Sequence, residues 1–163
     1  MTEHVAVNDK ALREQLVKLL MSEEAHASYE KAVAGMPFEL AGMKPDGAPH
    51  SAWEELEHLR ITLWDILEFS RDAKHVSPAW PEGYWPKSSA PKAADDWHES
   101  VKKYRADMKA MVTLVRDEKT DLFAKIPHGD GQTVLREALL AADHTAYHVG
   151  QLVLLRKMLG VWG

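Results

Sequence analysis

The chain has 163 residues, no cysteine and a formal net charge of −5. This length suits one domain, and we take residues 1–163 as a single domain. Without cysteine the chain has neither disulfides nor thiolate metal sites, so any metal needs nitrogen or oxygen ligands. The acidic balance argues against a nucleic-acid partner, and no apolar run is long enough to span a bilayer. Since the first residues do not resemble a signal peptide, we expect a cytoplasmic protein without a membrane partner.

Helical periodicity predicts that the chain begins with a long helix over about residues 8–33. Asn8 is a plausible N-cap, and an apolar stripe that includes Leu16 and Ala27 marks the face that packs inward. A loop rich in glycine and proline follows over residues 34–50. The first helix is therefore expected to be continuous up to that loop.

Two further helices are predicted on either side of a long connection. Ser51 and Glu54 stand at the spacing of a capping box, which predicts a helix from Ser51 to about residue 70. The next helix covers about residues 95–118. The connection between them, residues 71–94, contains four prolines and three large aromatic residues, Trp80, Tyr84 and Trp85. These aromatics either anchor the connection to the helices, form a wall of a substrate pocket or take part in a dimer contact.

A fourth helix is predicted from about Thr133 to Leu159, where Gly160 ends it. Four long helices without convincing strands predict an all-α fold, a four-helix bundle. The connection between the second and third helices is much longer than a tight turn requires, so it can cross from one end of the bundle to the other. We therefore expect an up-down-down-up order with a long crossover between helices two and three.

The fourth helix carries two histidines, His144 and His148, which lie four residues apart and so share one face. That face coincides with the main apolar stripe of the helix, so both imidazoles are expected to point into the bundle. Glu137 and Gln151 lie on the same stripe. Two inward histidines at this spacing can bind one metal ion, or each can simply be satisfied by a carbonyl or carboxylate.

A third ligand must come from another helix. Only His26 and His58 lie well inside predicted helices, and spacing alone leaves both possible. The carboxylates placed by spacing to accept a hydrogen bond from a ligand histidine are Glu54, Asp65 and Glu137. The catalytic candidates are Glu137, His26 and Glu23, of which His26 and Glu23 would act as a proton shuttle or an extra ligand.

These residues resemble the DinB-like (DinB/YfiT) superfamily of small bacterial four-helix-bundle proteins. The resemblance is carried by His58 in "SAWEELEHLRITLWDILEF", by "HTAYHVGQLVLLRKMLG" from His144, and by "WPEGYWP" in the crossover. It implies that His58, His144 and His148 bind a divalent metal, often zinc or nickel. It also implies the up-down-down-up order and frequent homodimers. Some members are thiol-dependent transferases or isomerases, and many have no known activity.

Two functions follow from an open site of three imidazoles. The first is a metal-dependent transferase or hydrolase that acts on a small molecule with an activated water or thiol. The alternative is a non-catalytic metal-binding stress-response protein in which the metal is structural. A homodimer is expected in addition, because the fourth helix has a second apolar face. This face contains Leu135, Leu139, Ala142, Ala146, Gly150 and Val153.

Overall fold

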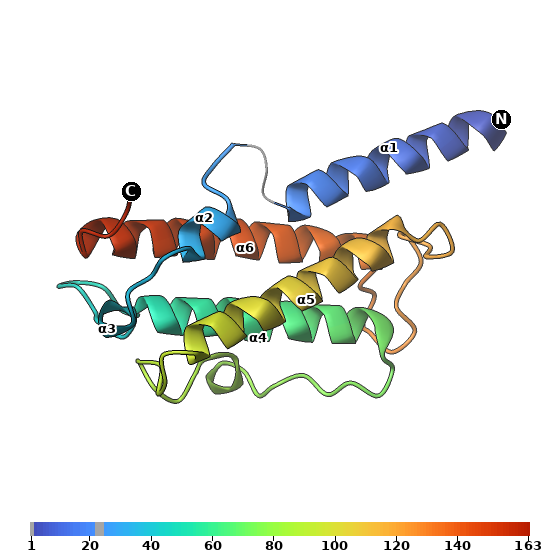
Figure 1. Ribbon diagram of the computed structural model, residues 1–163. Helices are drawn as coiled ribbons and strands as arrows, with labels where there is room; N and C mark the ends of the chain where they lie inside the picture. The colour runs from blue at the N-terminus through green and yellow to red at the C-terminus, as the bar shows by residue number, and fades with distance from the viewer. Residues whose placement is uncertain (1, 22–24) are drawn as a thin grey trace.

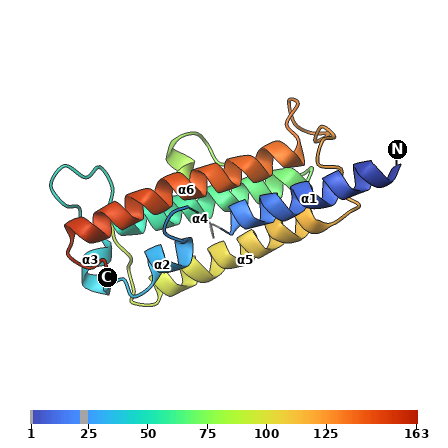
Figure 2. The ribbon, with the colours of Figure 1, turned by 90° about the horizontal axis from the view of Figure 1, so that it is seen from above.

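The computed structural model describes residues 2–21 and 25–163. Within these ranges the chain is all helical, as a helical bundle requires, and it contains no named strand. Two short helices and one 3-10 turn lie between the long helices (Figures 1 and 2). The elements are α1 (Thr2–Leu20), α2 (Tyr29–Val33), α3 (Phe38–Ala41), α4 (Ala52–Arg71), η1 (Glu82–Tyr84), α5 (Asp96–Arg116) and α6 (Val134–Met158).

The long helices lie roughly along one direction, and α4 lies beside both α5 and α6. The colours of Figure 1 show that α1 and α6 run from right to left, whereas α4 and α5 run from left to right. Residues 72–95 therefore have to return along the length of α4, and Figure 1 shows this segment beneath that helix. The crossover consequently covers a face of α4 that would otherwise meet solvent.

The prediction of one continuous first helix is wrong. Helix α1 already begins at Thr2, so Asn8 lies inside it and is not its N-cap, and α1 ends at Leu20. A separate helix, α2, starts after Ser28, whose hydroxyl accepts a hydrogen bond from the backbone N–H of Lys31 at 3.2 Å. Ser28 thus caps a new helix, and Ala27 belongs to the link instead of a continuous apolar stripe.

The other helix ends follow the local signals in the sequence. Ser51 caps α4 with both hydrogen bonds of the capping box present, and Thr133 caps α6 by accepting from the backbone N–H of Arg136. Gly160 has a φ of +72°, the left-handed conformation in which glycine commonly ends a helix. In each case one side chain or one glycine satisfies backbone groups that the helix leaves unpaired.

Helix α4 is buried on two faces. Its leucine stripe lies in the centre of the core, and each of these leucines is exposed by at most 2 %: Leu56, Leu59, Leu63 and Leu67. The opposite face carries His58 and Asp65, which are also buried. Among the helices described here, none is long and apolar enough to cross a membrane.

Candidate metal centre

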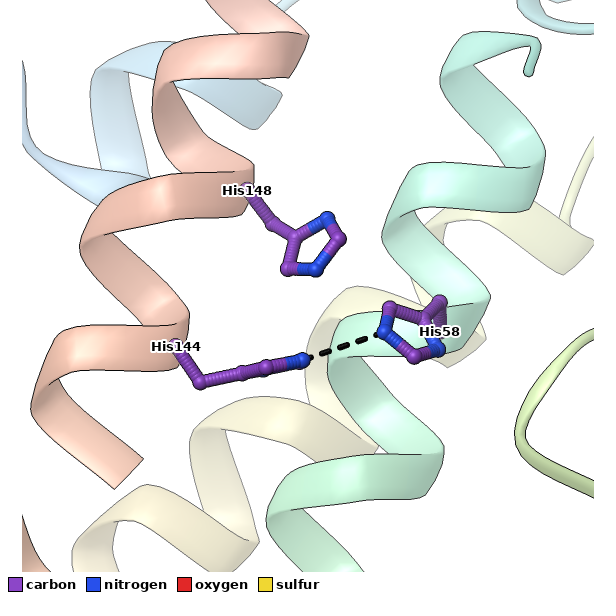
Figure 3. Close-up of side chains that lie close together, drawn as sticks. All are labelled: His58, His144 and His148. Atoms are coloured by element: carbon purple, nitrogen blue, oxygen red, sulfur yellow. Dashed lines mark hydrogen bonds between the residues drawn. The ribbon is translucent and has the colours of Figure 1, made fainter. Parts of the chain in front are cut away.

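Three histidines meet between α4 and α6. His58 comes from α4, while His144 and His148 come from successive turns of α6, and all three rings point toward the space between the helices (Figure 3). One nitrogen of each ring lies within 4.8 Å of the chosen nitrogens of the other two. The Nε2 atoms of His58 and His144 are 3.0 Å apart. Such a cluster could hold a divalent metal ion.

Hydrogen bonds of the outer ring nitrogens fix the orientation of two of these imidazoles. The Nδ1 of His58 donates to the backbone carbonyl of Tyr84 at 2.8 Å. The Nδ1 of His148 donates to Oε2 of Glu55 at 2.5 Å. Because a carbonyl and a carboxylate only accept, each Nδ1 carries a proton. The Nε2 of His58 then accepts the hydrogen bond from the Nε2 of His144. A histidine whose Nδ1 donates to a fixed acceptor can bind a metal through its Nε2.

An aromatic stack covers the outer side of His58. The ring of Trp85 lies parallel to His58, with centroids 4.0 Å apart and an interplanar angle of 5°. His50 stacks on the other face of Trp85, also at 4.0 Å. Both Trp85 and the Tyr84 carbonyl belong to the crossover region, so this segment orients His58 through two separate contacts.

The surroundings of His58 and His144 favour the neutral form of both rings. Burial, together with the neighbouring His148 and His58, lowers the pKa of His144 to about 3. Burial also lowers the pKa of His58, despite its hydrogen bond to Tyr84. Since a histidine must be neutral to bind a metal, the two imidazoles are already in the required state at neutral pH. The three imidazole donors, with His58 and His144 neutral, therefore fit a divalent metal that prefers nitrogen ligands.

Comparison with protein families matches residues 21–152 to the DinB superfamily. The chain belongs to the DinB superfamily. The matched range contains α2 to α5 and most of α6, including all three histidines. Comparisons with curated proteins and with solved structures gave no match.

In this DinB-superfamily chain, the alternative third ligand His26 is not brought to the cluster. Its side chain is exposed, and its Nδ1 contacts the carbonyl of the adjacent Ala27. The prediction that His26 faces inward is wrong because the helix on which that spacing was counted ends at Leu20. Glu23 lies outside the described residues. The structure thus brings His58, and not His26, to the two histidines of α6.

The carboxylates predicted near the site have other partners. Glu54 binds Lys44 at 2.9 Å and completes the capping box of α4. Glu137 is buried two helical turns before His144, and it accepts a hydrogen bond from Arg136 at 2.7 Å. Asp65 contacts the crossover and not a histidine of the cluster. These three carboxylates are therefore not the acceptors of the ligand histidines.

Sequence reasoning missed the two groups that do accept those hydrogen bonds. Glu55 lies three residues before His58, on the same side of the helix, and its exposed fraction is 4 %. A glutamate three residues before a candidate ligand histidine is a usable signal in the sequence, but the acceptors predicted from spacing include Glu54 and not Glu55. The carbonyl of Tyr84 carries no signal, because every residue has a backbone carbonyl and only the folded crossover places this one.

Two cavities of the protein lie outside the histidine cluster itself. One cavity, of about 1100 Å³, lies between α1 and α5 and is lined by none of the three histidines. A second cavity of about 210 Å³ is lined by His50, Glu55 and Gln151 among others. Since Glu55 binds His148 and His50 stacks on Trp85, this smaller cavity adjoins the residues that orient the cluster.

Proposed function

We propose that this protein is a metal-dependent enzyme that binds zinc or nickel through His58, His144 and His148. The observation that carries the proposal is the convergence of three imidazole nitrogens, two of them with the outer nitrogen already donating to a fixed acceptor. Three protein ligands leave coordination positions free, in contrast to a closed four-ligand structural site. The scaffold we propose is a four-helix bundle in up-down-down-up order, supported by the helix directions in Figure 1.

The reaction class we propose is a thiol-dependent transfer or a hydrolysis on a small molecule. A divalent metal supplies Lewis acidity, which lowers the pKa of a bound water or thiol or polarises a carbonyl. The chain's own contribution is to hold three imidazoles in place and to cover His58 with Trp85. His144 is partly exposed, which leaves an approach to the cluster from one side.

A non-catalytic role for the metal is the second candidate. Two observations favour it. The cluster joins α4 to α6, and none of its three histidines lines either of the cavities described above. In that case the metal would mainly hold the two helices together. Metal binding to the folded state stabilises it by about 2.7 kcal/mol when the free metal is at 100 times its dissociation constant.

The first experiment measures metal content in single variants. His58→Ala, His144→Ala and His148→Ala should each lose stoichiometric binding of Zn²⁺ and Ni²⁺, measured by elemental analysis after dialysis. The matched control is His26→Ala, which removes an exposed histidine and should retain full binding. Circular dichroism checks that each variant is folded. Full metal content in a folded His58→Ala variant would contradict the proposed ligand set.

The second experiment separates the enzymatic from the structural role. Co²⁺ is loaded into the protein, and its visible spectrum is followed while a small thiol such as 2-mercaptoethanol is added. An open site should give a new thiolate-to-cobalt absorption band, because a coordination position is free for an external ligand. An unchanged spectrum at millimolar thiol would favour the closed, structural role.

A further inference from the structure

The crossover is tied to α4 at a second point, one that does not touch the three histidines. Asp65 is 8 % exposed, and its two carboxylate oxygens bind two different residues of the crossover. Oδ1 accepts from Nε2 of His75 at 2.7 Å, and Oδ2 accepts from the hydroxyl of Tyr84 at 2.7 Å. One carboxylate therefore connects the beginning and the middle of the crossover to the same turn of α4.

Tyr84 links this tie to the candidate metal centre. Its hydroxyl is held by Asp65, while its backbone carbonyl accepts the hydrogen bond from His58 Nδ1. The following residue, Trp85, stacks on the His58 ring. Asp65 lies two helical turns after His58 on the same helix, too far along the axis to join the cluster itself. It contacts His58 only through the crossover.

We propose that Asp65 is a positioning residue for the metal site, which acts through the Tyr84 hydroxyl to hold the Tyr84 carbonyl and Trp85 against His58. This inference rests on the proposed metal-binding function. The hydrogen bond to the carbonyl keeps the proton on His58 Nδ1 and leaves Nε2 as the ligand atom, and the stacked Trp85 restricts rotation of the ring. Without the hydrogen bond between Asp65 and the Tyr84 hydroxyl, the crossover is held less firmly against α4. The ring of His58 then loses conformational freedom only when the metal binds, which weakens binding.

The size of the effect follows from the role. Removal of a group that orients a ligand histidine typically weakens metal binding by about 10- to 100-fold, whereas loss of the ligand itself abolishes it. Asp65→Asn keeps the shape of the side chain but replaces one acceptor by a donor, so it cannot accept from both His75 and Tyr84. Tyr84→Phe removes only the hydroxyl and leaves the backbone carbonyl in the chain.

The experiment measures the Zn²⁺ dissociation constant of the full-length protein by competition with a chromophoric chelator at fixed neutral pH. Both Tyr84→Phe and Asp65→Asn should raise this constant at least tenfold. The matched control is Tyr104→Phe, which also removes a tyrosine hydroxyl with one hydrogen bond, here to Thr145 at 2.8 Å between α5 and α6. This control should lose thermal stability but keep the wild-type dissociation constant.

A second readout uses no metal. In the ¹⁵N-labelled metal-free protein, the Nδ1–H of His58 should give a slowly exchanging imidazole signal, which weakens or broadens in Tyr84→Phe and remains in Tyr104→Phe. Unchanged zinc affinity and an unchanged His58 signal in folded Tyr84→Phe would overturn the positioning role. If wild-type protein binds no divalent metal, the proposed function fails, but the imidazole signal still decides whether Asp65 and Tyr84 orient His58.

Discussion

Two buried threonine hydroxyls differ in whether they have a hydrogen-bond partner. Thr145 on α6 is paired with Tyr104, whereas the hydroxyl of Thr62 on α4 is buried without any partner among the described residues. An unpaired buried hydroxyl costs about 1–3 kcal/mol, and valine has nearly the same shape as threonine. We expect Thr62→Val to raise the free energy of unfolding by about 1 kcal/mol and Thr145→Val to lower it by a similar amount. Urea denaturation of metal-free protein measures both, and a destabilised Thr62→Val variant would contradict the prediction.

The pH dependence of stability should report the burial of Glu137. Burial raises the pKa of this carboxyl above its ordinary value of 4.5, although the hydrogen bond from Arg136 opposes the shift. Between the ordinary and the raised pKa, the folded state holds more protons than the unfolded state, so stability falls as pH rises through this window. The loss of stability is complete above the folded-state pKa of Glu137. It disappears at acidic pH, where this carboxyl is protonated in both the folded and the unfolded state.

Glu137→Gln should therefore flatten the pH profile of stability. Relative to wild type, the variant should gain stability between pH 4 and pH 7, because it carries no charge that burial penalises. The measurement is the free energy of unfolding in urea, in the presence of a chelator, at several pH values. Glu118→Gln, at an exposed position, is the control and should leave the profile unchanged. A wild-type slope that persists in Glu137→Gln would sink this assignment.

At the level of elements, a single arginine attaches α2 to α6. Arg156 is buried, and its guanidinium donates to the backbone carbonyls of Ala32 and Ala34 at the end of α2, and to that of Val161 after α6. Hydrogen bonds from a charged donor contribute about 1.5–3 kcal/mol each in net stability. Arg156→Met keeps most of the packing volume but leaves these carbonyls without their donor.

We expect Arg156→Met to lower the free energy of unfolding by at least about 2 kcal/mol. The exposed neighbour Lys157→Met is the control and should change it by less than about 0.5 kcal/mol. Hydrogen exchange should show the loss first in the amides of α2. If Arg156→Met unfolds at the wild-type urea concentration with α2 equally protected, Arg156 does not anchor that helix.

The dependence of α2 on distant residues explains which elements could be predicted from the sequence. Local signals set three helix ends: Ser51 the start of α4, Thr133 the start of α6 and Gly160 the end of α6. These ends lie within a residue or two of the prediction. The five-residue α2 is too short to be stable alone. It is held by Arg156 and by Trp97, whose indole N–H donates to Val33 at 3.1 Å. Periodicity cannot reveal contacts between residues so far apart in the chain.

The same distinction applies to the candidate site. His144 and His148 could be paired from their spacing on one helix, but spacing left His26 and His58 equally possible as the third member. The choice of His58 came from the family resemblance, and the structure brings it to the other two. The Tyr84 carbonyl and the stacked Trp85 depend on the path of the crossover, which the sequence does not encode in any local pattern.

At the scale of the whole molecule, α4 and α6 each have a second face, and these two faces have different environments. On α4, the crossover covers the second face through His75, Tyr84 and Trp85, so this face needs no partner chain. On α6, Ala142 packs inside the protein's own core, but Leu139 is 44 % exposed. Tyr147 and Leu154, on neighbouring turns, are also exposed. The outer side of α6 therefore carries several exposed apolar side chains.

We propose that the protein forms a homodimer through the outer side of α6. Gly150 is the residue that indicates this surface. A glycine inside a helix costs about 1 kcal/mol relative to alanine, yet a Cβ added at Gly150 would meet no atom within 4 Å in the described chain. Packing within one chain thus gives no reason for a glycine here, whereas close approach of a second α6 would.

The last prediction is that a second copy of the chain packs on this surface. Wild-type protein should elute at twice the monomer mass of 18.4 kDa in size-exclusion chromatography with light scattering at micromolar concentration. Ala146→Glu should shift it to monomer, because it places a charge beside Gly150 in an apolar contact. Gly150→Ala discriminates further: it should weaken a dimer whose helices touch at Gly150, but stabilise a monomer by about 1 kcal/mol. A monomeric wild type would exclude the dimer, and a dimer unaffected by both variants would place its interface on another surface.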